Sequence, residues 1–307
     1  MGCPIIPDPG GLPGFPPSIV VAVKALACEI PSRLGLPISR FSREDLKRLV
    51  VEQGIVATIS GITIWRWLSK DAIKPWQYRT WLFPRDPQFA SKAGPILDLY
   101  QKKWMGMPLG PRDYVISTDE KTSIQARKRK AATSPPRPSS SMQVEHEYER
   151  GGALAYLAAW DVHRAKVFGR CEQKTGIQPF ERLVEQIMSQ EPYRSAQRVF
   201  WIMDNGSSHR GQASDARITE RWHTIIPVHT PIHASWLNQV EIYFSILQRK
   251  VLTPGDFSSL AELEDTILRF QGYYEKIAKP FRWKFTREEL NKLLAKLDAR
   301  TELKTAA

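Results

Sequence analysis

Apolar residues recur with two different periods along the chain. Before about residue 110 they fall three and four residues apart in short stretches, which is the spacing of amphipathic helices. From Tyr114 onward they form short apolar runs that end in acids or turn residues, which is typical of buried strands. The pattern therefore predicts a small all-α region followed by an α/β region.

Three short helices are predicted in the first region. The first covers about Ile19 to Glu29, the second follows Ser42 with Asp45 three residues further on, and the third follows Ser60. Serine is a favoured helix N-cap, so both serines mark helix starts. Because a short Gly-containing turn joins the second helix to the third, we expect a helix-turn-helix, whose second helix enters the DNA major groove.

The third predicted helix has two interpretations. Thr63, Arg66 and Lys70 lie three and four residues apart, so they can share an outward face that contacts DNA. Alternatively, the helices form an ordinary bundle whose core includes four apolar residues of this helix. Those residues are Ile62, Ile64, Trp65 and Leu68. We favour the first interpretation.

Five strands and two helices are predicted in the α/β region, and two further helices after residue 253. The strands cover residues 114–120, 152–162, 166–172, 198–205 and 222–230. One helix covers residues 178–190, and the other follows Ser235 as its N-cap. Three strands followed by alternating helix and strand predict a mixed sheet flanked by helices.

A long polar segment separates the first two predicted strands. Residues 123–149 are basic at the start and then rich in Pro and Ser, which predicts a mobile loop. The basic cluster comprises Arg127, Lys128, Arg129 and Lys130. We expect it either to bind DNA phosphates close to the end of the first strand or to be a solvated run of charge.

The helix after Ser235 has an apolar stripe with a polar line beside it. The stripe consists of Leu237, Val240, Phe244, Leu247 and Val251. The polar line consists of Asn238, Glu241, Ser245 and Gln248. A glutamate in such a line is usually a solvated surface residue, so another role for Glu241 needs support from elsewhere in the chain.

Composition narrows the class of protein and of partner. With 307 residues, 42% of them hydrophobic, the chain can form about two domains with a sizeable core. A formal net charge of +12 favours a polyanionic partner such as nucleic acid. The three cysteines are scattered without metal-ligand spacing, which favours a reduced, cytoplasmic protein. The apolar run near residue 20 is too short to span a bilayer, so no membrane association is predicted.

Three carboxylates occupy positions where chemistry is expected. Asp119 lies near the end of the first predicted strand, Asp204 near the end of the fourth, and Glu241 on the later helix. If the first and fourth strands are neighbours, the aspartates meet and the helix can bring Glu241 to them. Clustered carboxylates repel one another unless cations neutralise them, and hard oxygen ligands suit Mg²⁺ or Mn²⁺. Two such ions can activate an attacking hydroxyl and stabilise the leaving oxygen in phosphodiester chemistry.

Three motifs carry a family resemblance. "YVISTDEKTSIQAR", "WIMDNGSSHRG" and "HTPIHASWLNQVEIYFSI" resemble the acidic motifs of DDE transposases of the mariner-like superfamily. They are most similar to those of its bacterial insertion-sequence branch numbered six hundred and thirty. Asp204 and Glu241 are 37 positions apart, similar to the spacing in this superfamily. "VKALACEIPSRLGLPISRFS" and "SGITIWRWLSKDAIKPW" resemble the second helix-turn-helix unit of that branch.

The resemblance implies a fold, an activity and partners. The fold is ribonuclease-H-like, and the activity is cleavage and joining of double-stranded DNA at transposon ends, with two Mg²⁺ or Mn²⁺ ions. Asp119, Asp204 and Glu241 become the catalytic, metal-binding triad. The resemblance also implies target DNA as a partner, a homodimer on DNA, and a cytoplasmic, nucleoid-associated location.

Neighbours of the triad have expected supporting roles. Asn238 lies one turn before Glu241 on the same face and is the best candidate to support the ligands. Asn205 and His209 follow Asp204, and they either orient a metal ligand or contact phosphate, or are simply loop residues. Glu120 is expected on the opposite face of its strand.

Five segments are predicted, with the function concentrated in two of them. They are a disordered lead-in at 1–17, a helix-turn-helix DNA-binding domain at 18–72, a linker with a connecting helix at 73–110, a ribonuclease-H-like DDE catalytic domain at 111–252, and C-terminal helices at 253–307. Members of the family usually carry a further N-terminal helix-turn-helix. A truncated, non-transposing DNA-binding remnant is therefore the alternative to an active transposase, and a cellular nuclease of the same fold is a third reading.

Overall fold

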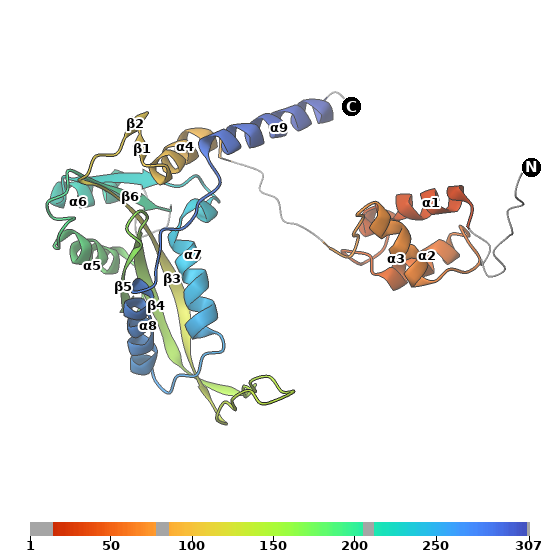
Figure 1. Cartoon of the computed structure of the whole chain (residues 1–307), viewed down its shortest axis with the longest axis horizontal. Helices are drawn as coiled ribbons and strands as arrows, with labels where there is room; N and C mark the ends of the chain where they lie inside the picture. The colour runs from red at the N-terminus through yellow and green to blue at the C-terminus, as the bar shows by residue number, and fades with distance from the viewer. Residues whose placement is uncertain (1–14, 78–85, 205–211, 306–307) are drawn as a thin grey trace, which may run out of the picture. The chain divides into compact units, whose positions relative to one another are not determined.

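The chain divides into two compact units, Met1–Leu82 and Phe83–Ala307. A computed structural model describes residues 15–77, 86–204 and 212–305 (Figure 1). The first unit is all-α and the second is α/β, so the change of apolar period is confirmed as a change of architecture. None of the described helices is long and apolar enough to span a membrane.

The first unit packs three helices around one apolar core. They are α1 (Pro17–Ala27), α2 (Arg43–Glu52) and α3 (Gly61–Lys70), with a 3₁₀ turn at Pro31–Leu34. The Ser42 hydroxyl accepts a hydrogen bond from the backbone N–H of Asp45, and the Asp45 carboxylate accepts one from the backbone N–H of Ser42. The Ser60 hydroxyl likewise accepts from the backbone N–H of Thr63. Both predicted helix starts are confirmed.

Helix α3 turns only part of its apolar surface toward the core. Ile64 and Leu68 are fully buried, whereas Ile62 and Trp65 are 59% and 45% exposed. The bundle interpretation, which places all four residues in the core, is therefore wrong for Ile62 and Trp65.

A five-stranded mixed sheet organises the second unit. Its strands are β3 (Asp113–Arg129), β4 (Tyr148–Asp161), β5 (Lys166–Glu172), β6 (Arg198–Met203) and β7 (Ile225–His229). Their order across the sheet is β5-β4-β3-β6-β7. Strand β4 pairs antiparallel with both β5 and β3, and β6 pairs parallel with both β3 and β7. The predicted mixed sheet flanked by helices is thus confirmed.

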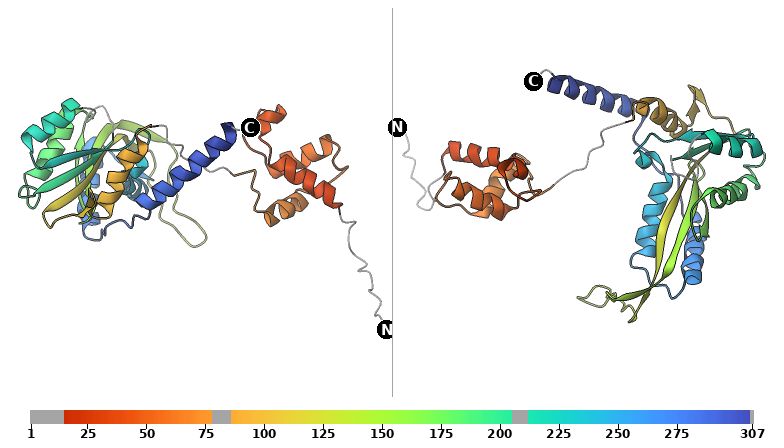
Figure 2. Two further views of the ribbon diagram at one scale, coloured as in Figure 1. Left: turned by 90° about the horizontal axis from the view of Figure 1, so that it is seen from above. Right: turned by 180° about the vertical axis from the view of Figure 1, so that it is seen from behind.

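Helices cover both faces of the sheet (Figure 2). One face packs against α4 (Phe89–Tyr100), α7 (Val240–Leu247) and α8 (Leu260–Glu275). The other packs against α5 (Ile177–Met188) and α6 (Gln212–Arg221). Successive residues of a strand point to opposite faces, so Val115 belongs to the first core and Ile116 to the second.

Smaller elements surround this sandwich. A short hairpin of β1 (Lys103–Trp104) and β2 (Met107–Pro108) follows α4. The last helix, α9 (Arg287–Thr305), packs on α4 through Leu290. Arg287 also forms a two-pronged ion pair with Asp98 of α4, at 2.8 and 2.6 Å. The two predicted C-terminal helices are therefore both present.

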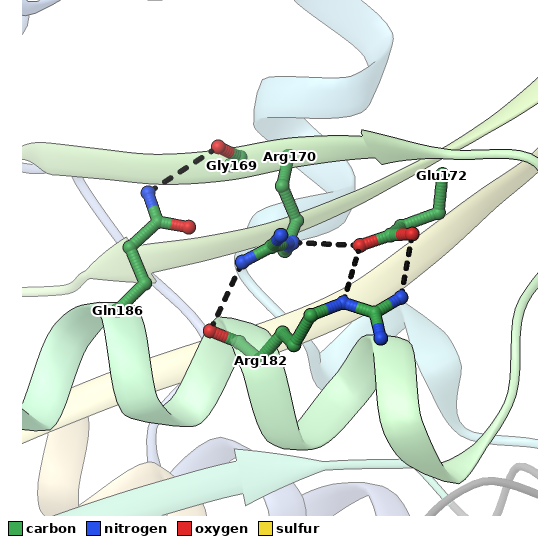
Figure 3. Close-up of polar contacts among 5 residues, drawn as sticks. All are labelled: Gly169, Arg170, Glu172, Arg182 and Gln186. Atoms are coloured by element: carbon green, nitrogen blue, oxygen red, sulfur yellow. Dashed lines mark hydrogen bonds and ion pairs between the residues drawn. The ribbon is translucent and has the colours of Figure 1, made fainter.

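Polar contacts fix α5 to the edge strand β5 (Figure 3). The Glu172 carboxylate accepts hydrogen bonds from Arg182 of α5 at 3.0 and 2.7 Å and from Arg170 of its own strand at 2.8 Å. The Arg182 contacts, more than those of Arg170, hold the pKa of Glu172 below its usual value. Gln186 donates to the Gly169 carbonyl one turn further along.

Two strands are longer than predicted. β3 runs to Arg129 and β4 begins at Tyr148, so the predicted loop over 123–149 is wrong at both ends. Figure 1 shows the last part of this pair as a ribbon that projects from the body of the second unit. Arg127–Arg129 and the facing residues of β4 are polar on both sides of the ribbon. The apolar alternation that reveals a strand is therefore absent there.

Two helical segments also differ from expectation. Helix α6 was not predicted, because its sequence places few apolar residues toward the core. Helix α7 begins at Val240 rather than after Ser235, since Ser235–Leu237 form a 3₁₀ turn and Asn238 has an extended backbone. The cause is tertiary: the Asn238 side chain turns away from the helix and bonds to β3.

Candidate active site

The register of β3 and β6 brings the first two acids together. The strands are parallel, with Ile116 opposite Trp201 and Ser117 opposite Ile202. Two residues further along lie Asp119, still in β3, and Asp204, which directly follows the last residue of β6. Neighbouring strands lie about 4.8 Å apart, so the register places these two residues at adjacent positions at the end of the parallel pair.

Helix α7 carries Glu241 to the same face of the sheet. The backbone N–H of Val240, the first residue of α7, donates to Ser117 Oγ at 2.9 Å. Glu241 follows directly and is half-buried. The predicted apolar stripe packs into the core beneath it, including Val240, Phe244 and Leu247. The stripe therefore holds the helix on the sheet with Glu241 at the edge.

Asn238 links the segment before α7 to the strand that carries Asp119. Its side chain is fully buried, and its amide nitrogen donates to the Thr118 carbonyl at 2.8 Å and lies 3.4 Å from Asp119 Oδ2. Its amide oxygen accepts a hydrogen bond from the Ser117 hydroxyl. Ser117, Asn238 and the Val240 N–H thus form a buried polar bracket between β3 and α7.

Helix α4 supports the same segment from behind. The Tyr100 hydroxyl donates to the Leu237 carbonyl at 2.5 Å. Asp86, just before α4, accepts from the backbone N–H of Ile232 at 3.1 Å and pairs with Lys92 at 2.9 Å. The loop that leads to Glu241 is therefore held at two points by residues near the start of the second unit.

The pKa of Glu241 depends on its burial and on two charged neighbours, Lys121 and Asp204. Burial raises the pKa of its carboxyl, the nearby Lys121 ammonium opposes that rise, and the Asp204 carboxylate adds to it. Lys121 was missed in the sequence, although alternation from Asp119 sets it on the same face. Glu120 lies in register with Leu157 of the α5 core, so it faces away from the triad.

A histidine and a further acid stand beside Asp204. His229 Nε2 is 2.9 Å from Asp215 Oδ1, and His229 Nδ1 is 3.5 Å from the Asp204 carbonyl oxygen. Sequence reasoning gave neither residue a role, because 14 positions separate them and only the fold brings them into contact.

Asp161 is another acid whose sequence context gives no hint of burial. It is only 1% exposed and accepts a hydrogen bond from the Tyr193 hydroxyl at 2.7 Å. Its other oxygen accepts the backbone N–H groups of His163 and Arg164 in the turn after β4. The turn uses the carboxylate as an internal acceptor, as Asx-turns do.

The donor set of the triad fits a hard divalent cation. Asp119, Asp204 and Glu241 offer carboxylate oxygens from three segments, and burial together with the Asp204 carboxylate raises the pKa of Glu241 by more than Lys121 lowers it, so a further cation would be favourable here. Within residues 15–77, 86–204 and 212–305, no three Asp, Glu, His or Cys side chains are already grouped closely enough to hold a metal ion. Binding would therefore require these side chains to turn toward one another.

The candidate DNA-binding residues occupy two surfaces. On α3, Arg66 and Lys70 are exposed, whereas Thr63 is half-buried and its hydroxyl contacts that of Ser60 at 2.8 Å. Asn205 and His209 lie outside the described residues.

The basic cluster lies at the far end of β3. Arg127 and Lys128 are exposed, and Arg127 and Arg129 lie over the Tyr148 ring. Arg129 donates to the Glu145 carbonyl, and Lys130 pairs with Glu147 at 2.6 Å. At about 3.3 Å per strand residue, Arg127 is roughly 25 Å from Asp119. The expectation that this cluster lies close to the first acid is therefore wrong, because the strand continues where a loop was predicted.

Comparison with known proteins identifies the second unit more closely. Residues 114–264 match a family described as DDE superfamily endonuclease. No curated protein sequence matches the chain.

Solved structures of a transposase share the fold. The mariner Mos1 paired end complex with Mg gives a TM-score of 0.55 at 14% identity, over 96% of this chain and 83% of that one. A pre-cleavage Mos1 transpososome gives 0.52 at 14% identity, over 94% and 81%. The Mos1 mariner paired end complex with Mn gives 0.51 at 13% identity, over 87% and 77%. The α/β unit thus has the ribonuclease-H-like fold of DDE transposases, and a helical region precedes it.

Proposed function

We propose that this protein is a transposase that cleaves DNA and joins strands with the help of Mg²⁺ or Mn²⁺. One observation carries the proposal: Asp119, Asp204 and Glu241 approach the same edge of one sheet face from β3, β6 and α7. The match of residues 114–264 to DDE superfamily endonucleases supports this assignment. Mos1 complexes with Mg and with Mn support the choice of cation.

The side chains of the site have different roles in phosphodiester chemistry. Two metal ions, when held by the three carboxylates, supply an activated hydroxyl and stabilise the leaving oxygen. Asp119 and Asp204 take their spacing from the strand register, and Glu241 completes the oxygen donor set. The Asn238 amide holds one Asp119 oxygen, and the backbone N–H of Glu120 holds the other at 2.7 Å. Lys121 offers positive charge to an incoming phosphate.

Two further surfaces are proposed to bind duplex DNA. The exposed cations of the β3–β4 ribbon, Arg127 and Lys128, lie roughly 25 Å from Asp119, which corresponds to about seven base pairs at 3.4 Å each. They would therefore contact the DNA backbone away from the reacting phosphate. The helices of the first unit act as a helix-turn-helix, with Arg66 and Lys70 of α3 at the DNA.

Finer assignments follow from the sequence resemblance. We assign the chain to the bacterial insertion-sequence branch numbered six hundred and thirty on its three motifs and their spacing. A homodimer acting on paired terminal repeats and a cytoplasmic, nucleoid-associated location complete the proposal. The net charge of +12 supports an association with DNA.

The test is cleavage of supercoiled plasmid by the purified chain in Mg²⁺ or Mn²⁺. Asp204→Asn should retain DNA binding and lose metal-dependent nicking, because it removes one anionic ligand. Glu120→Gln, which removes an adjacent acid on the opposite face, is the matched control and should still nick. Nicking by Asp204→Asn at the unmodified rate would refute the proposal. Binding without cleavage in either metal would favour the DNA-binding remnant.

A further inference from the structure

The outward face of α3 combines apolar and cationic side chains. Ile62, Trp65, Arg66 and Ser69 are three, four and seven residues apart, the spacing of one helical face. All four are exposed, while Ile64 and Leu68 hold the opposite side in the core. Ile62 and Trp65 leave 59% and 45% of their surface in solvent, and the packing of the first unit does not explain large apolar side chains at these positions.

The positive charge on this face of α3 indicates what kind of partner it binds. Helix α3 contains no acidic residue, and Arg66 and Lys70 form no ion pair among the described residues. Asp71, which follows the helix, is paired with Lys24 at 2.7 Å. The face is therefore cationic as well as apolar, which fits a polyanion that also presents apolar groups.

We propose that Ile62 and Trp65 read the C5-methyl groups of thymines in the DNA major groove. The inference rests on the proposed function, in that it requires the first unit to bind duplex DNA. Thymine is the base that presents a methyl group in this groove, and apolar side chains recognise it by contact. Ile62 is the second residue of α3, and residues near the start of a recognition helix are those that contact base edges. Arg66 and Lys70, on the adjoining part of the face, would bind phosphate or a guanine edge.

This proposal changes which residues of α3 contact the bases. The sequence pattern alone suggests a face formed by Thr63, Arg66 and Lys70. Thr63 lies at the side of α3, where its hydroxyl and backbone N–H both contact the Ser60 cap. Ile62 and Trp65 therefore replace it as the residues that set sequence preference, and Arg66 is common to both faces.

The test begins with the full chain and a random-sequence 20-base-pair duplex library. The sequence enriched by binding should contain thymines. Replacing each of these by deoxyuridine removes only the methyl group and keeps base pairing. At one or two positions the affinity should fall about fourfold, the equivalent of one buried methyl group at about 0.8 kcal/mol.

Variants assign that effect to the two side chains. Ile62→Ala and Trp65→Ala should each abolish the uracil penalty at one position while leaving salt-dependent binding to unselected DNA in place. Ile62 is 59% and Trp65 45% exposed, so Ile62→Ala should lower the unfolding temperature less than Trp65→Ala, and the affinities are measured well below both unfolding temperatures. Val21→Ala removes another apolar side chain, 65% exposed on α1, and should leave the uracil penalty unchanged.

Several results would overturn the inference. An enriched sequence without thymine, no uracil effect, or an unchanged effect in both variants would each do so. A change of oligomeric state in the variants, with thymine dependence intact, would show that the face binds a second copy instead. Plasmid cleavage that depends on Asp204 but shows no methyl effect would contradict this inference alone. A chain that enriches no sequence and cleaves no DNA would contradict the proposed function as well.

Discussion

The bracket around Asn238 makes a quantitative prediction about stability and activity. Asn238→Ala removes the donor to the Thr118 carbonyl and the acceptor of the Ser117 hydroxyl, all in a fully buried setting. A buried polar group left without its partner costs about 1–3 kcal/mol. We therefore expect the free energy of unfolding to fall by about 2 kcal/mol. For a unit of this size that corresponds to a melting temperature lower by about 4–8 °C.

The same variant should weaken cleavage beyond its effect on folding. Residues that orient a metal ligand typically contribute about 10–100-fold to metal affinity or activity. Asn238→Ala should therefore raise the Mg²⁺ concentration needed for half-maximal plasmid nicking, measured well below its melting temperature. Asn238→Asp keeps the shape but adds a carboxylate beside Asp119, so it should alter the metal dependence with less loss of packing.

A control at the other end of α7, directly after its last residue, separates positioning from general destabilisation. Gln248 lies on the same polar line, and its side chain bonds to Thr253 at 2.7 Å, away from the acids. Gln248→Ala should leave the Mg²⁺ dependence unchanged. If Asn238→Ala lowers the melting temperature but leaves the Mg²⁺ dependence intact, the bracket is structural only. If it changes neither, the reasoning is wrong.

Three further outcomes are expected. The side chain of Asp113 is 1% exposed and accepts hydrogen bonds from Arg198 at 3.0 and 2.5 Å. Asp113→Asn should therefore lower the free energy of unfolding of the second unit by about 2 kcal/mol, measured by thermal unfolding. The expected loss is not larger because Arg198 is 35% exposed, so solvent already weakens the ion pair. Because Arg198 holds the pKa of Asp113 below its unfolded value near 3.9, this contribution should be present above pH 4 and be lost as the pH falls below it. Arg127→Gln should reduce the slope of log affinity for DNA against log salt concentration by about one, whereas Lys130→Gln, which loses an ion-paired lysine, should reduce it less. EDTA should abolish nicking and leave DNA binding in place, and either Mg²⁺ or Mn²⁺ should restore it; nicking that survives EDTA would contradict the metal requirement.

Local chemistry made part of this structure predictable from the sequence. Each helix cap involves a serine and a backbone N–H three residues later, so the caps at Ser42 and Ser60 could be predicted from the local sequence. The stripe beneath Glu241 could be read because helix burial follows a fixed period. The sequence allowed the strands that lead to Asp119 and Asp204 to be neighbours without requiring it, and the parallel pairing of β3 with β6 supplies that order.

Features that depend on contacts between residues far apart in the chain could not be predicted from the sequence. The start of α7 moved to Val240 because Asn238 bonds to a strand some 120 residues earlier in the chain. The contact between His229 and Asp215 depends on how β7 and α6 pack, and the burial of Asp161 on a turn that closes over it. The outer end of the β3–β4 pair, Arg127–Arg129 with the facing residues of β4, is polar on both faces, so its pairing leaves no trace in the pattern of apolar residues.

The central claim is that Asp119, Asp204 and Glu241 form one metal site. Calorimetric titration of the full chain with Mn²⁺, in the presence of duplex DNA, tests it most directly. Asp119→Asn, Asp204→Asn and Glu241→Gln should each weaken Mn²⁺ binding at least tenfold, by about 1.4 kcal/mol or more, while Glu120→Gln binds as the unmodified chain does. Unchanged Mn²⁺ affinity in Glu241→Gln would contradict the claim and return Glu241 to an ordinary helix surface.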